Sequence, residues 1–150
     1  MKLTENFLEF IRLLNKKGVR YLIVEGYAYA FYAEPRYTRD IDIFIEISKE
    51  NAEKILEVIK EFGFSDINLQ EEDFLEPDIV VRLGVPPIMI EILTSISGVN
   101  FEEAWKRRVK GKFGSETAYF ISLEDLIHNK RATGRLRDLA DAEILEELRK

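Results

Sequence analysis

Apolar and polar residues alternate along the chain in two patterns, one typical of helices and one typical of strands. Helical spacing of apolar residues predicts helices near 7–17, 27–31, 49–62 and 101–108, and two more within 122–150. Runs of β-branched residues or strict alternation predict strands near 20–24, 40–46, 79–83, 88–93 and 117–121. The acidic segment 70–78 fits neither pattern, and we interpret it as a loop.

Residues at the ends of these segments support the predicted boundaries. Ser48 and Ser122 are suited to cap the helices that follow them, and Asp125 gives the second helix a capping-box-like start. Gly63 ends one helix, and Gly134 separates or kinks the two C-terminal helices. The order of elements predicts an α/β (α+β) fold, in which a mixed β-sheet is flanked by helices and followed by a C-terminal helical segment.

Length and composition limit the classes of protein that the sequence can encode. A chain of 150 residues predicts a single domain, 1–150, with a core at about 1–121 and C-terminal helices at about 122–150. The hydrophobic share of 46% and charged share of 33% predict a soluble globular protein. No apolar run is long enough to span a membrane and no signal-peptide pattern is present, so we expect no membrane partner. The absence of cysteine favours a cytoplasmic location, and with His128 as the one histidine we do not expect a histidine-based zinc site or a Ser-His-Asp triad in the usual form.

Closely spaced carboxylates are the first chemical signal. Asp40 and Asp42 lie on the same face of a predicted strand, whereas Ile41 and Ile43 point to the other face, into a core. Glu91 lies in a second alternating strand, where a buried charge is costly without a partner. A shared site for a hard cation such as Mg²⁺ would explain all three acids. Taken alone, the two aspartates are weak evidence for such a site, because a solvated strand face accounts for them.

Gly26 is the second signal, because it lies where a predicted strand leads into a helix. A residue without a side chain lets the backbone approach a phosphate closely, and the N–H groups at a helix start attract anions. A plain turn glycine is the alternative. In combination with the carboxylates downstream, Gly26 indicates a site for the phosphates of a nucleotide and their magnesium ions.

The chain resembles nucleotidyltransferases of the polymerase-β type, particularly small bacterial and archaeal members that include the AbiEii-type toxins. Segments 24–28 and 35–43 resemble a G-G-x-A turn followed by R-x-T/S-x-D-h-D. Segments 123–130 and 134–141 resemble a helical lysine followed by R-x-x-D-x-x-D. The resemblance covers most of the chain. It implies a nucleotidyltransferase fold and transfer of a nucleoside monophosphate from a nucleoside triphosphate to an acceptor hydroxyl.

The resemblance also implies roles for individual residues. Asp40, Asp42 and Glu91 would be the catalytic acids and the ligands of two Mg²⁺ ions, and Glu91 would also activate the attacking hydroxyl. Lys130 would face the phosphates of the nucleoside triphosphate. The residues implied to contact the nucleotide are Gly26, Tyr27, Arg36, Thr38, Lys130 and Arg135.

Basic residues in these motifs have structural alternatives. Arg36 could pair with Asp138 or Asp141 instead of a phosphate. Arg135, Asp138 and Asp141 are also spaced so that they could form an ion-pair lattice on one helix.

Glu25 departs from the family pattern, because it occupies the position of the first glycine of the turn. A carboxylate beside a triphosphate site weakens binding through like-charge repulsion. We therefore hypothesise that Glu25 attenuates turnover without abolishing it.

The acceptor is less well indicated. The net charge of −6 does not suggest a general nucleic-acid binder. The basic cluster 106–112, beside Trp105 and Phe113, favours an RNA acceptor such as tRNA, although such charges also occur on solvated helix faces. Protein hydroxyls and small antibiotics are other acceptors, and we expect no separate acceptor domain in a chain of this length.

Three functions are compatible with these signals. The first is a Mg²⁺-dependent nucleotidyltransferase in a toxin–antitoxin or related stress system, with an antitoxin or other partner protein. The second is a catalytically weak or inactive member of the same fold that binds a nucleotide or a protein. The third is another metal enzyme, such as a D-x-D glycosyltransferase or a nuclease, although neither class requires Gly26 in its turn.

Overall fold

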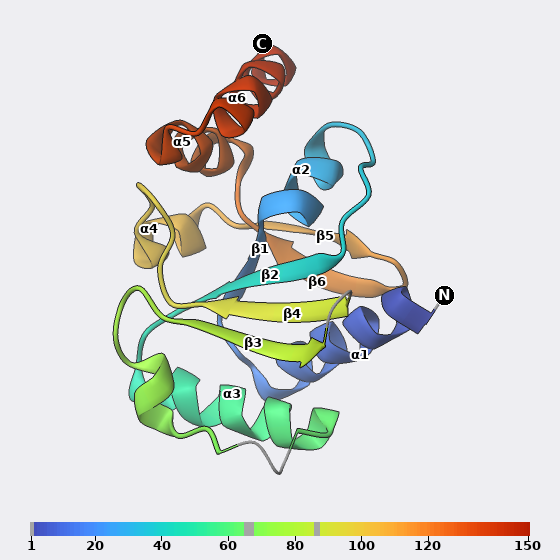
Figure 1. Cartoon of the computed structure of the whole chain (residues 1–150), viewed down its shortest axis with the longest axis vertical. Coiled ribbons are helices and arrows are strands. Elements are labelled where there is room, and N and C mark those ends of the chain that lie inside the picture. Colours follow the sequence, from blue (N-terminus) through green and yellow to red (C-terminus); the bar gives the residue numbers. More distant parts are fainter. Residues whose placement is uncertain (1, 65–67, 86–87) are drawn as a thin grey trace.

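The computed structural model describes residues 2–64, 68–85 and 88–150 and has a mixed α/β architecture (Figure 1). The strands are β1 (Tyr21–Val24), β2 (Asp40–Ile45), β3 (Val80–Val85), β4 (Ile88–Leu93), β5 (Val109–Phe113) and β6 (Glu116–Phe120). The helices are α1 (Lys2–Lys17), α2 (Glu25–Tyr32), α3 (Lys49–Phe62), α4 (Phe101–Lys106), α5 (Leu123–Thr133) and α6 (Leu136–Arg149). A 3₁₀ turn, η1, spans Glu71–Phe74. The predicted fold class is confirmed.

The described strands form one six-stranded sheet in the order β3-β4-β2-β1-β6-β5. β2 is central, with β1 antiparallel on one side and β4 parallel on the other. The hairpins β3–β4 and β5–β6 form the two edges, and β6 runs parallel to β1. This topology places the acidic strands β2 and β4 side by side, although they are distant in the sequence.

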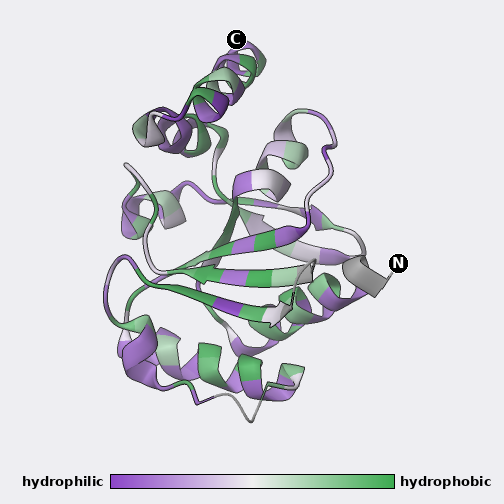
Figure 2. Cartoon of the chain, in the orientation of Figure 1, coloured by the Kyte–Doolittle hydropathy of each residue, from purple (hydrophilic) through white to green (hydrophobic). Residues whose placement is uncertain are grey.

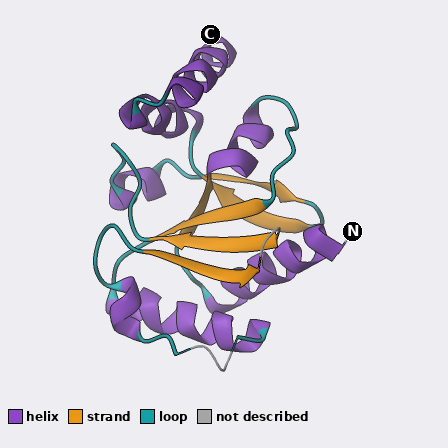
Figure 3. Cartoon of the chain, in the orientation of Figure 1, coloured by secondary structure: helices purple, strands orange, loops and turns teal. Residues whose placement is uncertain are grey.

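Helices cover both faces of the sheet (Figure 3). α1 and α3 lie on one face, and α2, α4 and the C-terminal helices lie on the other. Ile41 and Ile43 of β2 enter the core beneath α1 and α3, whereas Phe44 enters the core on the opposite face. Figure 2 shows hydrophobic residues along the strands and on the helix faces turned toward them. Because side chains alternate along a strand, Asp40 and Asp42 share the face of Phe44, on the side of the C-terminal helices.

The helix ends agree with the predicted caps. The Oγ atoms of Ser48 and Ser122 accept hydrogen bonds from the backbone N–H groups of Asn51 and Asp125. Gly134 adopts φ +72°, a left-handed conformation that ends α5 and turns the chain into α6.

The main departure from the sequence prediction follows α4. This helix ends at Lys106, and the residues of the basic cluster from Val109 onward form edge strand β5 of a hairpin, so they are not a helix face. The strand alternation there is short and is weakened by Gly111, a residue depleted in strands. The structure supplies the reason for this glycine, because a Cβ at Gly111 would lie 2.5 Å from Cε1 of Phe31.

The acidic segment 70–78 also differs from a plain loop. It contains η1, in which the backbone N–H of Gln70 donates to the Asp73 carboxylate at 2.8 Å and Phe74 is fully buried. In the described part of the chain, no helix combines the length and apolar character that crossing a membrane requires.

Candidate active site

The predicted acids lie on two adjacent strands. Asp42 of β2 pairs in parallel register with Glu91 of β4. Asp40, two residues earlier in β2, pairs with Met89. Residues in register on neighbouring strands point to the same face, so the carboxyl groups of Asp42 and Glu91 are neighbours. The sequence predicted each strand, and the sheet order brings their acids together.

Asp42 has the most strongly perturbed carboxyl of this group. Burial contributes most to raising its pKa, and the charges of Glu25, Glu91 and Asp40 and a hydrogen bond with Glu91 add to the shift, to about 8. A carboxyl with this pKa keeps its proton near neutral pH. A divalent cation bound among these acids would replace that proton.

Glu91 has a partner that the sequence did not reveal. The Nε atom of Arg82, on the neighbouring strand β3, lies 3.3 Å from a Glu91 carboxylate oxygen. The Arg82 side chain is exposed, so the pair lies at the rim of the acidic group. Antiparallel register between β3 and β4 determines this contact, and no local sequence pattern predicts it.

The donor set is chemically suited to Mg²⁺, because hard cations take carboxylate oxygens. In the present side-chain arrangement, however, no three His, Cys, Asp or Glu residues within 2–64, 68–85 and 88–150 are placed to hold a metal ion. A metal site made by Asp40, Asp42 and Glu91 therefore requires their side chains to reorient, and it stays a prediction.

A cavity of about 470 Å³ opens beside the acids, between the sheet and the C-terminal helices. The predicted site residues that line it are Gly26, Arg36, Thr38, Asp40, Asp42, Lys130 and Arg135. Glu25, Tyr37, Arg39, Arg137 and Asp138 complete the lining. Residues from opposite ends of the chain thus meet at one polar cavity.

Two predicted site residues lie outside the cavity lining. Glu91 is one of them, beside Asp42 on the neighbouring strand. Tyr27 is the other: its ring packs edge-on against Phe7 and Phe113, and its hydroxyl donates to the Thr38 carbonyl at 3.3 Å. These contacts give Tyr27 a structural role.

The turn before α2 differs from the predicted one. The helix begins at Glu25, and Glu25 has the left-handed conformation, with φ +59°. Gly26 lies in the first helical turn, where a Cβ would be 2.7 Å from Cγ2 of Thr38. Gly26 therefore allows the loop that precedes β2 to approach α2 closely. The sequence pattern had instead predicted that Gly26 lets the backbone approach a phosphate.

Lys130 lies in a buried ion-pair network. Its side chain is 5% exposed, and its Nζ lies 3.3 Å from Asp138 and 3.2 Å from Asp141. Arg36 donates two hydrogen bonds to Asp141, at 3.0 and 2.9 Å, and its guanidinium lies 3.7 Å from the centre of the Tyr29 ring. Of the two roles open to Arg36, the structure supports pairing with Asp141.

The same network determines the charge of both aspartates. Burial would raise the pKa of Asp138, but hydrogen bonds from Thr133 and Arg135 and the charge of Lys130 lower it. Burial would likewise raise the pKa of Asp141, but hydrogen bonds from Arg36 and Lys130 lower it. The predicted ion-pair lattice of the C-terminal helices is therefore present and extends to the loop before β2.

Arg39 and Arg137 are the cations that sequence reasoning missed. Both line the cavity, and neither makes an ion pair with another described residue. Arg39 immediately precedes Asp40, and Arg137 is two residues after Arg135, so both lie within the recognised motif segments, at positions to which the motifs assign no role. An arginine without a carboxylate partner on a cavity wall is suited to bind an anion such as a phosphate.

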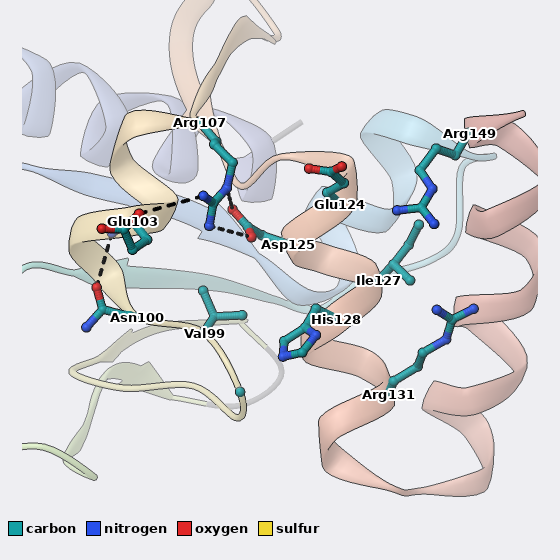
Figure 4. A pocket seen from close by; sticks show the side chains of 11 residues that line it. Val99, Asn100, Glu103, Arg107, Glu124, Asp125, Ile127, His128, Arg131 and Arg149 are labelled. Atoms are coloured by element: carbon teal, nitrogen blue, oxygen red, sulfur yellow. Dashed lines mark hydrogen bonds and ion pairs between the residues drawn. The ribbon is translucent and has the colours of Figure 1, made fainter.

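A second cavity, of about 500 Å³, lies between α4 and the C-terminal helices (Figure 4). Arg107 there donates two hydrogen bonds to Asp125, each 3.0 Å long. Arg131 and Arg149 both pair with Glu146. Because its arginines are already paired and the acids of β2 are not part of it, we place the candidate active site in the first cavity.

Comparison with known proteins supports the fold. No protein-family model matches the sequence, and a search of curated proteins finds no match. Among solved structures, the chain resembles an antigenic nucleotidyltransferase-like protein from Paracoccidioides brasiliensis. The TM-score is 0.56 at 12% identity, over 99% of this chain and 76% of that one. This similarity shows that the chain has a nucleotidyltransferase-like fold.

Proposed function

We propose that this chain is a Mg²⁺-dependent nucleotidyltransferase that transfers a nucleoside monophosphate from a nucleoside triphosphate to an acceptor hydroxyl. One observation carries the proposal: a single cavity joins Asp40 and Asp42 to the basic residues of the loop before β2 and of the C-terminal helices. The nucleotidyltransferase-like fold supports it.

In this proposal, Asp40, Asp42 and Glu91 would hold two Mg²⁺ ions, which would offset the charge that develops on the attacking and leaving oxygens. Glu91 lies at the edge of the group, where it could accept the proton of the attacking hydroxyl. The hydroxyl oxygen attacks the α-phosphorus, the bond to the bridging oxygen breaks, and pyrophosphate leaves.

The basic residues of the cavity lining would bind the phosphates. Arg39 and Arg137 are the first candidates to hold them, because other described residues do not neutralise their charges. Arg135 is largely exposed and could join them, although it now contacts Asp138 at 2.8 Å. Lys130 would contribute charge from within its network, since its Nζ is shared by two aspartates.

The acceptor and the cellular setting belong to the same proposal. We propose an RNA such as tRNA as acceptor, with a protein hydroxyl as the alternative, and a cytoplasmic toxin–antitoxin system with a partner protein, as in the AbiEii-type toxins that the motifs resemble. The basic cluster 106–112 favours RNA, because its Arg108 lies 3.9 Å from the centre of the Trp105 ring, and basic and aromatic groups together suit single strands.

Transfer of label tests the proposal. The protein would be incubated with Mg²⁺ and each α-³²P-labelled nucleoside triphosphate in turn, in the presence of total cellular RNA and protein. We expect label in one acceptor class with the native chain and none with Asp40→Asn/Asp42→Asn. The matched control is Glu143→Gln, an exposed change on α6 that should leave transfer intact. Equal label from the Asp40→Asn/Asp42→Asn variant would overturn the proposal.

A catalytically weak or inactive nucleotide-binding module is the second candidate. Two observations favour it: the charge of Glu25 acts on Asp42, and Lys130 is occupied by two aspartates. Such a module would still be stabilised by Mg²⁺ with a nucleoside triphosphate, because binding to the folded state alone raises the melting temperature. A ligand-induced rise in melting temperature without label transfer would identify the module.

A further inference from the structure

Tyr37 is the most exposed large hydrophobic side chain of the candidate site. It lines the cavity beside Asp40, and 79% of its surface is accessible to solvent. Among the described residues that line this cavity, it is the only aromatic one. Most of the remaining lining residues have charged side chains, both acidic and basic.

The backbone on both sides of Tyr37 is anchored. Arg36 is held by two hydrogen bonds to Asp141. Thr38 packs against Gly26, its hydroxyl donates to the Arg36 carbonyl at 3.1 Å, and its own carbonyl accepts from Tyr27. The neighbouring residues thus fix the backbone from which the exposed ring projects, and a backbone ordered before binding loses less entropy when a ligand stacks on the ring.

A nucleoside triphosphate has three parts with different chemical needs. Mg²⁺ held by carboxylates suits the phosphate oxygens, and arginines suit the remaining phosphate charge. The base is a flat aromatic ring. Stacking on an aromatic side chain binds such a ring better than carboxylate groups do. In this cavity, only Tyr37 offers such a surface among the described residues.

We propose that Tyr37 forms a nucleobase-binding subsite at the edge of the cavity, by stacking on the base of the bound nucleoside triphosphate. The inference rests on the proposed function and deepens it, because it names the residue that binds the base of the substrate. Stacking uses the face of the base, which all four bases have, so Tyr37 contributes affinity without selecting one base.

Binding measurements separate the base from the phosphates. Calorimetry with Mg²⁺ would compare each nucleoside triphosphate with inorganic tripolyphosphate, which lacks the base. We expect Tyr37→Ala to weaken all four nucleoside triphosphates by roughly five- to a hundred-fold, the effect of losing one base stack. Binding of tripolyphosphate should stay unchanged, and Tyr37→Phe should retain native affinity for every ligand. Leu136→Ala is the matched control, because Leu136 is exposed, apolar and next to Arg135 and Arg137.

The outcomes distinguish the two proposals. A native chain that binds neither ligand would overturn the proposed function and this subsite with it. Native nucleotide affinity in Tyr37→Ala would overturn the subsite alone. Equal weakening of nucleotide and tripolyphosphate would also overturn it, because Tyr37 would then act by shaping the loop.

Discussion

Glu25 has two unfavourable features: a left-handed backbone conformation and a negative charge beside the acids of the candidate site. A non-glycine residue with φ +59° carries a backbone cost of about 1–2 kcal/mol, which a glycine at this position would avoid. We predict that Glu25→Gly raises the free energy of unfolding above that of Glu25→Ala by about 1 kcal/mol, because alanine removes the charge but keeps the strain. Urea denaturation of the two variants measures the difference. Equal stability would show that the conformation carries no strain.

Gly26 is the neighbouring residue, and its role is steric. A Cβ there would lie 2.7 Å from Cγ2 of Thr38, so Gly26→Ala should destabilise the fold by about 1–3 kcal/mol, as overpacking does. Thr38→Ser deletes that methyl group and should recover most of the loss. A double-mutant cycle measures this coupling. Additive effects would place the clash elsewhere.

Site residues that lie on regular strands were predictable from the sequence, because the local pattern determines which face they occupy. Asp40 and Asp42 share a strand face because side chains alternate, and this holds in any β-strand. Glu91 was inferred from a charge in an apolar strand, but its neighbour Arg82 follows only from sheet register. Tyr37 and Arg39 were not assigned, because a loop without periodicity gives no signal of what its side chains line.

At the scale of elements, an ion-pair network joins α5, α6 and the loop before β2. Lys130 is buried and contacts one carboxylate oxygen each from Asp138 and Asp141. Removing one partner of a buried pair leaves charges without compensation, so Lys130→Met should cost roughly 3 kcal/mol of unfolding free energy. Arg131→Met is the matched comparison, because it removes an exposed ion pair between α5 and α6, the one with Glu146. If the two variants are equally stable, the buried network stabilises the packing of α5 on α6 no more than the exposed ion pair does.

The same network predicts sensitivity to acid. The pKa values of Asp138 and Asp141 are lowered in the folded chain, so their contribution is present near neutral pH. It is lost as the pH falls below about 4, the pKa of an aspartate in an unfolded chain, through the lowered folded values. Unfolding free energy measured from pH 6 to pH 3 should therefore fall more steeply for the native chain than for Asp138→Asn/Asp141→Asn. Parallel curves would contradict the lowered pKa values.

Elements were predictable where a pattern was long or strict. The segments of α1, α3, β2 and β4 have clear periodicity, and the structure places helices and strands there. β5 was missed because basic residues follow α4 directly and its alternation is broken by Gly111. That glycine is required by the ring of Phe31, a contact between distant segments that no local window contains.

At the scale of the whole molecule, the cavity is assembled from two parts of the fold. The acids come from the sheet, whereas Lys130, Arg135 and Arg137 come from the C-terminal helices. α5 and α6 meet the rest of the chain mainly through α2, α4 and the loop before β2. A nucleotide that contacts acids and cations together would therefore link the helix pair to the sheet.

This linkage makes a regional prediction for amide hydrogen exchange. Some amides of α6 exchange only when α6 opens in a way that abolishes nucleotide binding. With Mg²⁺ and a nucleoside triphosphate at 100 times its Kd, the exchange rate of these amides should fall by about 100-fold. Amides of α3, which lies on the opposite face of the sheet, should change little when they exchange by local fraying (Figure 1). Asp40→Asn/Asp42→Asn should lose the Mg²⁺-dependent part of the protection in α6. Protection confined to α2 and β2 would mean that the ligand does not reach the helix pair, and the phosphate-binding role of its basic residues would then be wrong.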